Sequence, residues 1–148
     1  QNGDGCGGLV PWNGGPGRRL ESPSHLFMTT TSCPPFRPLQ PRLFEFGISV
    51  CRWTHGLPRN PAGLNIAKQV VRSAMSATAT HAEARGAESA RDFLHKLQLC
   101  LKELRETAVW LHAAKRLGYD SEESGRLCQE CRELIAIFVA SVNTLKSR

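Results

Sequence analysis

The sequence predicts an all-α protein, an antiparallel up-down-up-down four-helix bundle that follows a disordered N-terminal extension. From Phe93 to Ala114, apolar positions recur at alternating spacings of four and three, as on the inner face of a bundle helix. Three further segments have helical periodicity, and the loops between them are short, which makes consecutive helices antiparallel neighbours. No segment shows the period-two alternation of a β-strand.

The chain divides into an extension over residues 1–41 and a helical domain over residues 42–148. Seven glycines fall within the first 17 residues, and five prolines lie between Pro23 and Pro41. Such a segment buries too little apolar surface to offset the entropy lost on ordering, so we expect it to be disordered. The chain begins with Gln1, and its first methionine is Met28. One hypothesis is that residues 1–27 are a leader or sequence added for expression.

The first helix is predicted from Arg42 to about His55. Pro41 suits the first turn of a helix, and Gly56 is a plausible stop. The spacing of three and four predicts one buried face, made of Leu43, Phe46, Val50 and Trp53.

The second helix is predicted to open at Asn60, as N-cap, with Pro61 in the first turn, and to end near Gly86. Small residues dominate its second half, which would let a neighbouring helix approach closely. Its expected buried stripe consists of Ala67, Val70, Val71, Ala74, Thr78 and His81.

The third helix is predicted from Ala90 to Leu117 and would be about 40 Å long. Ser89 and Asp92 form a variant of the capping box at its start, and Gly118 ends it. Its expected core seam, with a single polar member, consists of Phe93, Leu97, Cys100, Leu104, Thr107, Leu111 and Ala114.

The fourth helix is predicted to start with Asp120 as N-cap and Glu123 at the third helical position. Acidic side chains in this first turn also complement the positive end of the helix dipole. Its expected stripe consists of Leu127, Cys131, Leu134, Phe138, Val142 and Leu145.

The net charge of +6 is concentrated in one stretch. Residues 28–81 hold six basic side chains and one acidic side chain, whereas the remainder of the chain is nearly neutral. A local excess of this kind is where a polyanion would bind. The candidate nucleic-acid-binding residues are Arg52, Arg59, Lys68 and Arg72. The alternative for the first three is that they are simply solvated, and for Arg72 that it pairs with Glu83 or a neighbouring subunit's acid.

No constellation of residues indicates an enzyme, a metal site or a cofactor. Cys128 and Cys131 lack the second ligand pair that a zinc site needs, so packing is the favoured interpretation. Glu103 and Glu106 lack the Glu-x-x-His motifs of a di-iron bundle, and ion pairing with a neighbouring helix is expected instead.

The cysteines and the hydropathy pattern predict a cytoplasmic protein with no membrane partner. Four cysteines fall within the helical segments, where free thiols behave as small apolar groups. The longest apolar run, from Leu134 to Val142, is about half of what a membrane span needs.

Three blocks of sequence follow one another along the predicted second and third helices: QVVRSAMSATATHAEA from Gln69, RGAESARDFLHKL from Arg85 and KELRETAVWL from Lys102. In their order and spacing these blocks resemble the bacterial four-helix bundle family known as the 23S rRNA intervening-sequence proteins. LFEFGISVCRWTHGLP, from Leu43, is similar to the family's first helix. The resemblance runs from about Leu43 to Arg148.

The resemblance implies a four-helix bundle assembled into a homo-oligomeric ring, usually a pentamer. A relative of the family, the accessory variability protein of diversity-generating retroelements, binds nucleic acid and a reverse transcriptase through a basic surface. The chain departs from many relatives at Thr78-Ala79-Thr80, where they have Gly-Ala-Asn. The family's patterned polar positions fall on Gln69, Arg72, Ser76, Glu83, Glu88, Ser89, Asp92, Lys102, Glu103, Arg105 and Glu106. From these we expect a structural polar network of Gln69, Ser76, Glu83, Glu103 and Glu106.

Two functions are compatible with the sequence. The first is a non-catalytic, oligomeric accessory protein that contacts RNA, DNA or a ribonucleoprotein, with a protein partner such as a reverse transcriptase. The alternative is a structural protein–protein interaction oligomer with no nucleic-acid role.

Overall fold

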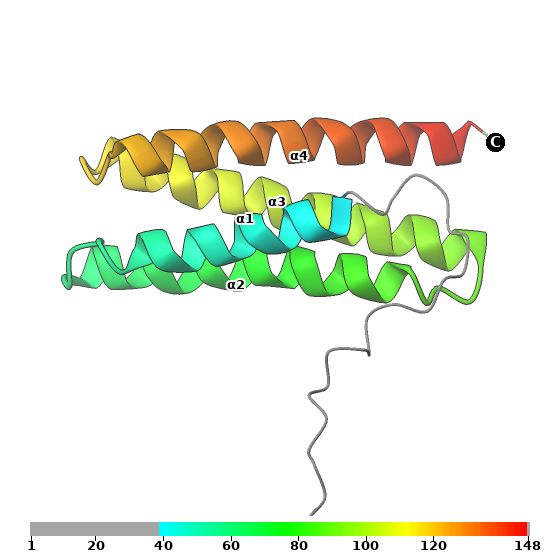
Figure 1. Cartoon of the computed structure of the whole chain (residues 1–148), viewed down its shortest axis with the longest axis horizontal. Coiled ribbons are helices and arrows are strands. Elements are labelled where there is room, and N and C mark those ends of the chain that lie inside the picture. The colour runs from blue at the N-terminus through cyan, green and yellow to red at the C-terminus, as the bar shows by residue number, and fades with distance from the viewer. Residues whose placement is uncertain (1–38, 148) are drawn as a thin grey trace, which may run out of the picture. The chain divides into compact units, whose positions relative to one another are not determined.

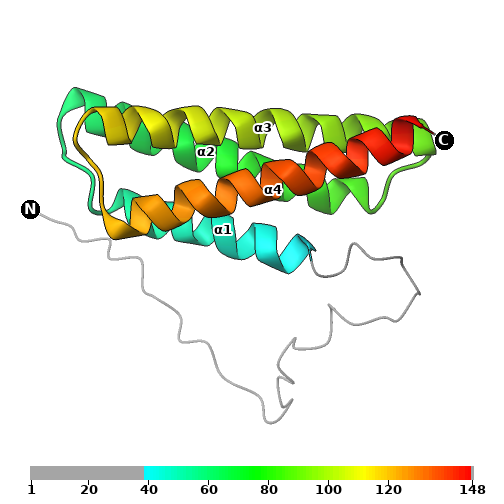
Figure 2. The same cartoon turned by 90° about the horizontal axis from the view of Figure 1, so that it is seen from above.

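The computed structural model describes residues 39–147, which form four long α-helices. They are α1 (Leu39–Thr54), α2 (Pro61–Ala84), α3 (Ala90–Arg116) and α4 (Glu122–Lys146). Successive helices run in opposite directions (Figure 1). Each helix packs on the next, and α4 closes the ring of helices by packing on α1 (Figure 2). The predicted up-down-up-down four-helix bundle is confirmed.

Helix α1 begins three residues before its predicted start. Leu39 lies one turn before Leu43 and is buried, so it extends the apolar face of the helix. Pro41 is in the first turn, where its missing N–H leaves no broken hydrogen bond. The helix therefore includes residues 39–41, which the sequence had placed in the N-terminal extension. Residues 1–38 lie outside the described residues, so the structure does not bear on the predicted extension or on the hypothesis about residues 1–27.

The starts of α2 and α3 follow the predicted caps. The Asn60 side chain accepts a hydrogen bond from the Gly63 N–H at 2.8 Å, and the Ser89 hydroxyl accepts one from the Asp92 N–H at 3.1 Å. Each satisfies an amide that has no partner within the helix. Gly118, with a φ of 78°, follows the end of α3 in the left-handed conformation that favours glycine.

The predicted cap of α4 is wrong by one residue. Ser121 is the N-cap and forms a reciprocal capping box with Ser124, with N···O distances of 3.1 and 2.8 Å. The Asp120 carboxylate instead accepts from the Ser124 hydroxyl at 2.8 Å and pairs with Lys115 of α3 at 3.6 Å. Asp120 thus joins the α3–α4 loop to both helices.

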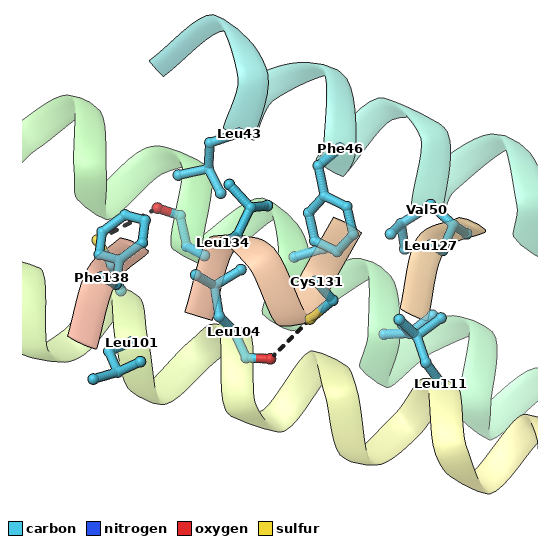
Figure 3. Close-up of a cluster of buried hydrophobic side chains, with 14 of the residues drawn as sticks. Leu43, Phe46, Val50, Leu101, Leu104, Leu111, Leu127, Cys131, Leu134 and Phe138 are labelled. Carbon is cyan, nitrogen blue, oxygen red and sulfur yellow. Dashed lines mark hydrogen bonds between the residues drawn. The ribbon is translucent and has the colours of Figure 1, made fainter. Parts of the chain in front are cut away.

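The core lies along the bundle axis (Figure 3). The predicted seam of α3 is buried except at Phe93, which is half-buried, and the α4 stripe is buried except at its last member, Leu145. The α2 stripe needs correction, because Ala67 and Val71 are only partly buried. The positions that complete its buried face are Gly63, Ile66, Ser73, Ala77 and Ala84.

Helices α1 and α2 approach closely where α2 carries small residues, as predicted. A Cβ placed on Gly47 would lie 3.1 Å from the Met75 Sδ and 3.2 Å from the Thr78 Oγ1. The Thr78 hydroxyl lies 3.0 Å from the Ala74 carbonyl oxygen and 3.2 Å from that of Leu43. A buried threonine therefore fits beside α1 with its hydroxyl satisfied.

His81 is the largest polar side chain in the core, and its burial makes stability depend on pH. Its Nδ1 contacts the Gln40 Oε1, and its ring packs edge-on against Phe138 at a centroid distance of 5.5 Å. Burial, assisted by the nearby charge of Arg85, lowers the pKa of His81 below its usual value. The folded state therefore favours the neutral imidazole.

We expect the bundle to lose stability as pH falls below about 6.5. The unfolded chain then binds a proton at His81 that the folded chain resists, so His81 stabilises the fold fully only above that pH. The slope contributed by one group cannot exceed about 1.4 kcal/mol per pH unit. Urea unfolding at about pH 7.5 and about pH 5.5 should show a smaller difference for His81→Gln than for the wild type. Equal differences would contradict the assignment.

Candidate nucleic-acid interface

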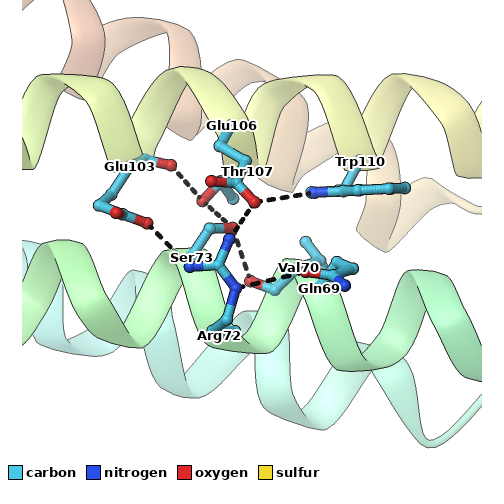
Figure 4. A network of polar contacts seen from close by, with 8 residues as sticks. All are labelled: Gln69, Val70, Arg72, Ser73, Glu103, Glu106, Thr107 and Trp110. Atoms are coloured by element: carbon cyan, nitrogen blue, oxygen red, sulfur yellow. Dashed lines mark hydrogen bonds and ion pairs between the residues drawn. The ribbon is translucent and has the colours of Figure 1, made fainter.

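Arg72, one of the four candidate cations, forms ion pairs with acidic side chains of α3 (Figure 4). Its Nη1 lies 3.5 Å from the Glu103 Oε2, and its Nη2 donates to the Glu106 carboxylate. Its Nε donates to the Gln69 Oε1 at 3.3 Å. The predicted alternative of a pair with Glu83 is wrong, because eleven residues separate the two along α2, a rise of about 16 Å.

The polar contacts between α2 and α3 have an ionic part and a hydroxyl part. Arg72 holds the pKa of the Glu106 carboxyl below its usual value, and the Trp110 Nε1 donates to the same carboxylate at 3.3 Å. Beneath them the Thr107 and Ser73 hydroxyls lie 2.8 Å apart in the core. The side chains of Trp110, Thr107 and Ser73 were not among the predicted network. The spacing of Glu106 and Trp110, one helical turn, is the sequence signal that indicates their contact.

Glu103 depends on Arg72 for its charge balance. Its Oε2 is buried and accepts no hydrogen bond from the described residues, because the 3.5 Å contact with Arg72 is an ion pair without hydrogen-bond geometry. Gln69, Glu103 and Glu106 therefore lie together, as the predicted polar network requires. Ser76 and Glu83, its other two expected members, lie outside the contacts of Arg72.

A second cation of the basic stretch is also neutralised within the bundle. Arg42 of α1 donates to both carboxylate oxygens of Glu130 on α4, at 2.6 and 2.9 Å, and contacts Glu133 as well. These contacts hold the pKa of the Arg42 guanidinium above its usual value. Arg42 and Arg72 thus tie helices together, and both are paired with acids inside the bundle.

The remaining candidates, Arg52, Arg59 and Lys68, are exposed, and none of them forms an ion pair within residues 39–147. Arg52 lies in the last turn of α1, Arg59 in the loop that follows, and Lys68 on α2. Arg52 also lines a surface pocket that contains Asp120 and Glu123, so its positive field is partly offset. The three cations are therefore spread over the end of α1, the α1–α2 connection and the first half of α2.

The cysteines of the bundle pack as apolar groups. Cys100 and Cys131 are buried, and their sulfur atoms lie 3.6 and 3.4 Å from the carbonyl oxygens of Ala77 and Leu104. Burial raises the pKa of both thiols to about 12, so they are protonated at neutral pH. Among the residues that the structure describes, no three His, Cys, Asp or Glu side chains gather as a metal site would require. Likewise, none of the described helices is apolar over the length that a membrane crossing demands.

Comparisons with known proteins identify a family and a similar solved structure. The family model of the 23S rRNA-intervening sequence protein matches residues 41–140. A crystal structure of a protein with unknown function from the S23 ribosomal protein family of Bacteroides thetaiotaomicron is similar, with a TM-score of 0.65 and 26% sequence identity. The similarity covers 70% of this chain and 97% of that chain. No curated protein matches the chain.

Proposed function

The chain belongs to the 23S rRNA-intervening sequence protein family, and from this premise we propose that it is a non-catalytic, oligomeric accessory protein that contacts nucleic acid. The proposed contact is the basic surface of Arg52, Arg59 and Lys68 on α1, α2 and their connection. The supporting observation is that these three side chains are exposed and form no ion pair with residues 39–147. A phosphate can bind such cations and release condensed counterions without breaking an internal pair.

Assembly is the second part of the proposal. We propose a homo-oligomeric ring, a pentamer, in which each cation is repeated once per subunit. Repetition turns a weak patch into a multivalent surface with far higher avidity. Leu64 supports an interface near this surface, because it is 56% exposed and lies one turn before Lys68 on α2. A ribonucleoprotein or a reverse transcriptase is the protein partner we propose, in the cytoplasm, where the free thiols would stay reduced.

The test replaces Arg52, Arg59 and Lys68 together with Gln. Fluorescence anisotropy with structured RNA and duplex DNA, at several salt concentrations, measures the slope of log affinity against log salt. The slope should become shallower by about 0.7–0.9 for each phosphate that the variant no longer binds. The decrease should be similar for unrelated sequences, because side chains that bind phosphates do not read bases. Arg72 is left unchanged, since its removal would strip the buried Glu103 carboxylate of its ion pair.

A control changes a cation on α4. Arg132 is exposed and forms no ion pair within residues 39–147, and replacing it with Gln removes a charge from a helix that carries none of the three proposed cations. This variant should keep the wild-type slope, and both variants should keep the wild-type oligomer size by light scattering. A triple variant that binds as the wild type does would show that these three cations do not bind the nucleic acid.

The alternative is a structural protein–protein interaction oligomer with no nucleic-acid role. The observation that favours it is a set of large apolar side chains at the surface of the bundle. They are Phe44, Leu64, Leu99, Val109 and Leu117, each at least 38% exposed. If the wild-type oligomer binds neither RNA nor DNA even at low salt, this alternative replaces the nucleic-acid function.

A further inference from the structure

The solvent-facing side of α3 carries a continuous row of positions with heptad spacing. From Arg91 to His112, each position of the row precedes a position of the buried seam by two residues. Two residues turn an α-helix by about 200°, so the row lies on the side of α3 opposite the core. Every member of the row is exposed. The row, called here the α3 outer row, consists of Arg91, His95, Gln98, Lys102, Arg105, Val109, His112 and Arg116.

The α3 outer row contains cations and neutral side chains but no carboxylate. All three acids of α3 lie off the row, and each is bound by a cation that is also off the row. Asp92 pairs with Lys96 at 2.6 Å, whereas Glu103 and Glu106 both pair with Arg72 of α2. Within residues 39–147, none of the cations of the row forms an ion pair. No acid of α3 is therefore ion-paired with the row, although Lys102 lies near enough to Glu106 to help lower the pKa of that carboxyl.

Helix α4 extends this positive surface sideways. Lys102 and Arg105 line a groove between α3 and α4, and Lys146 of α4 lines the same groove. Leu101, Val139 and Val142 supply its apolar part, and no Asp or Glu is among its lining residues. The three cations therefore lie around one groove, which is formed by the middle of α3 and the C-terminal half of α4.

We propose that the α3 outer row binds the phosphodiester backbone of a nucleic-acid duplex. The inference rests on the proposed function, in that it assumes nucleic-acid binding, and it assigns a second surface that the basic residues of α1 and α2 do not include. From Arg91 to Arg116 the row is about 38 Å long, and duplex DNA presents about one negative charge per 1.7 Å of its axis. Several cations of one straight helix can thus contact phosphates together.

Three features of the row favour a duplex over other partners. It has no Phe, Tyr or Trp on which the bases of a single strand would stack, and its only rings are the imidazoles of His95 and His112. Its one apolar member, Val109, offers too little area to be the apolar anchor at the centre of a protein interface. A rigid helix holds its cations in a fixed line, which suits a partner that is itself stiff. Such cations bind phosphates, so the affinity should not depend on sequence.

The test replaces Arg91, Lys102 and Arg105 together with Gln. Because these side chains are exposed and unpaired within the described bundle, the variant should keep the thermal midpoint and oligomer size of the wild type. We expect its affinity for an RNA duplex and for a DNA duplex of equal length to fall by at least about tenfold at low salt, with a shallower salt slope. Lys102→Arg, which keeps the charge, should bind as the wild type does. If the triple variant folds poorly, the single variant Arg105→Gln provides the same comparison of slopes.

Comparing the two triple variants separates this inference from the proposed function. If the α3 variant binds normally while the Arg52, Arg59 and Lys68 variant does not, the inference is wrong and the proposed function stands. If only the α3 variant binds more weakly, the inference stands and the proposed residues on α1 and α2 are wrong. Tighter wild-type binding of a single strand than of either duplex would overturn the duplex assignment. If the wild type binds no nucleic acid, both fail.

Discussion

Leu104→Ala is expected to lower the free energy of unfolding by roughly 2–5 kcal/mol, the cost of truncating a buried leucine in a packed core. Leu104 has no exposed surface and lies at the centre of the α3 seam (Figure 3). Its carbonyl oxygen accepts a hydrogen bond from the Cys131 thiol of α4, so both the backbone and the side chain of Leu104 contact the neighbouring helix. Truncation would leave a cavity where α3 packs against α4.

Lys102→Ala is the matched control, because it changes an exposed side chain on the same helix. It should cost less than about 1 kcal/mol. Urea unfolding followed by circular dichroism at constant pH gives both values. If the two variants unfold at the same urea concentration, the register assigned to α3 is incorrect.

Gly63→Ala should destabilise the bundle by roughly 3 kcal/mol, although alanine normally favours a helix over glycine. A Cβ at this position would lie 2.0 Å from the Pro58 carbonyl oxygen, which is backbone and cannot rotate away. Relief requires the α1–α2 connection to move. That movement would disturb the cap in which Asn60 accepts from the Gly63 N–H, and the Asn60 contact with the Tyr119 hydroxyl at 3.2 Å.

Gly125→Ala on α4 is the control, because a Cβ there would meet no atom within 4 Å. Without a clash the helix propensity of alanine prevails, and this variant should gain up to about 1 kcal/mol. Thermal midpoints should move in opposite directions, by about 2–4 °C for each kcal/mol at this chain length. A shared direction would mean that the close approach at Gly63 does not constrain the connection.

The sequence by itself determined the helices and most of their buried faces. Heptad spacing over α3 requires one apolar side, and the caps at Asn60 and Ser89 are local, so neither depends on how the helices pack. The cap of α4 was harder to predict, because Asp120 and Ser121 are adjacent and both residue types are good caps. In the structure Ser121 forms the reciprocal capping box with Ser124, whereas Asp120 accepts from the Ser124 hydroxyl and pairs with Lys115. The buried face of α2 was displaced because its small residues carry little hydropathy contrast.

Only the tertiary structure decided which charges remain available to a partner. Arg42, Arg52, Arg59, Lys68 and Arg72 look alike in a count of charge. The packing of α1 on α4 pairs Arg42 with an acid, and the packing of α2 on α3 does the same for Arg72. The other three cations form no ion pair among the described residues.

A count of charge along the sequence also fails to reveal the α3 outer row. Residues 82–148 are nearly neutral in sum, so a count over that segment hides a carboxylate-free face. The spacing of Arg91, Lys102 and Arg105 was present in the sequence. Which side of α3 faces solvent, and where its acids find their counter-ions, depends on contacts between residues far apart in the chain. Charge that is summed along a sequence ignores direction, whereas a folded helix separates its charges by face.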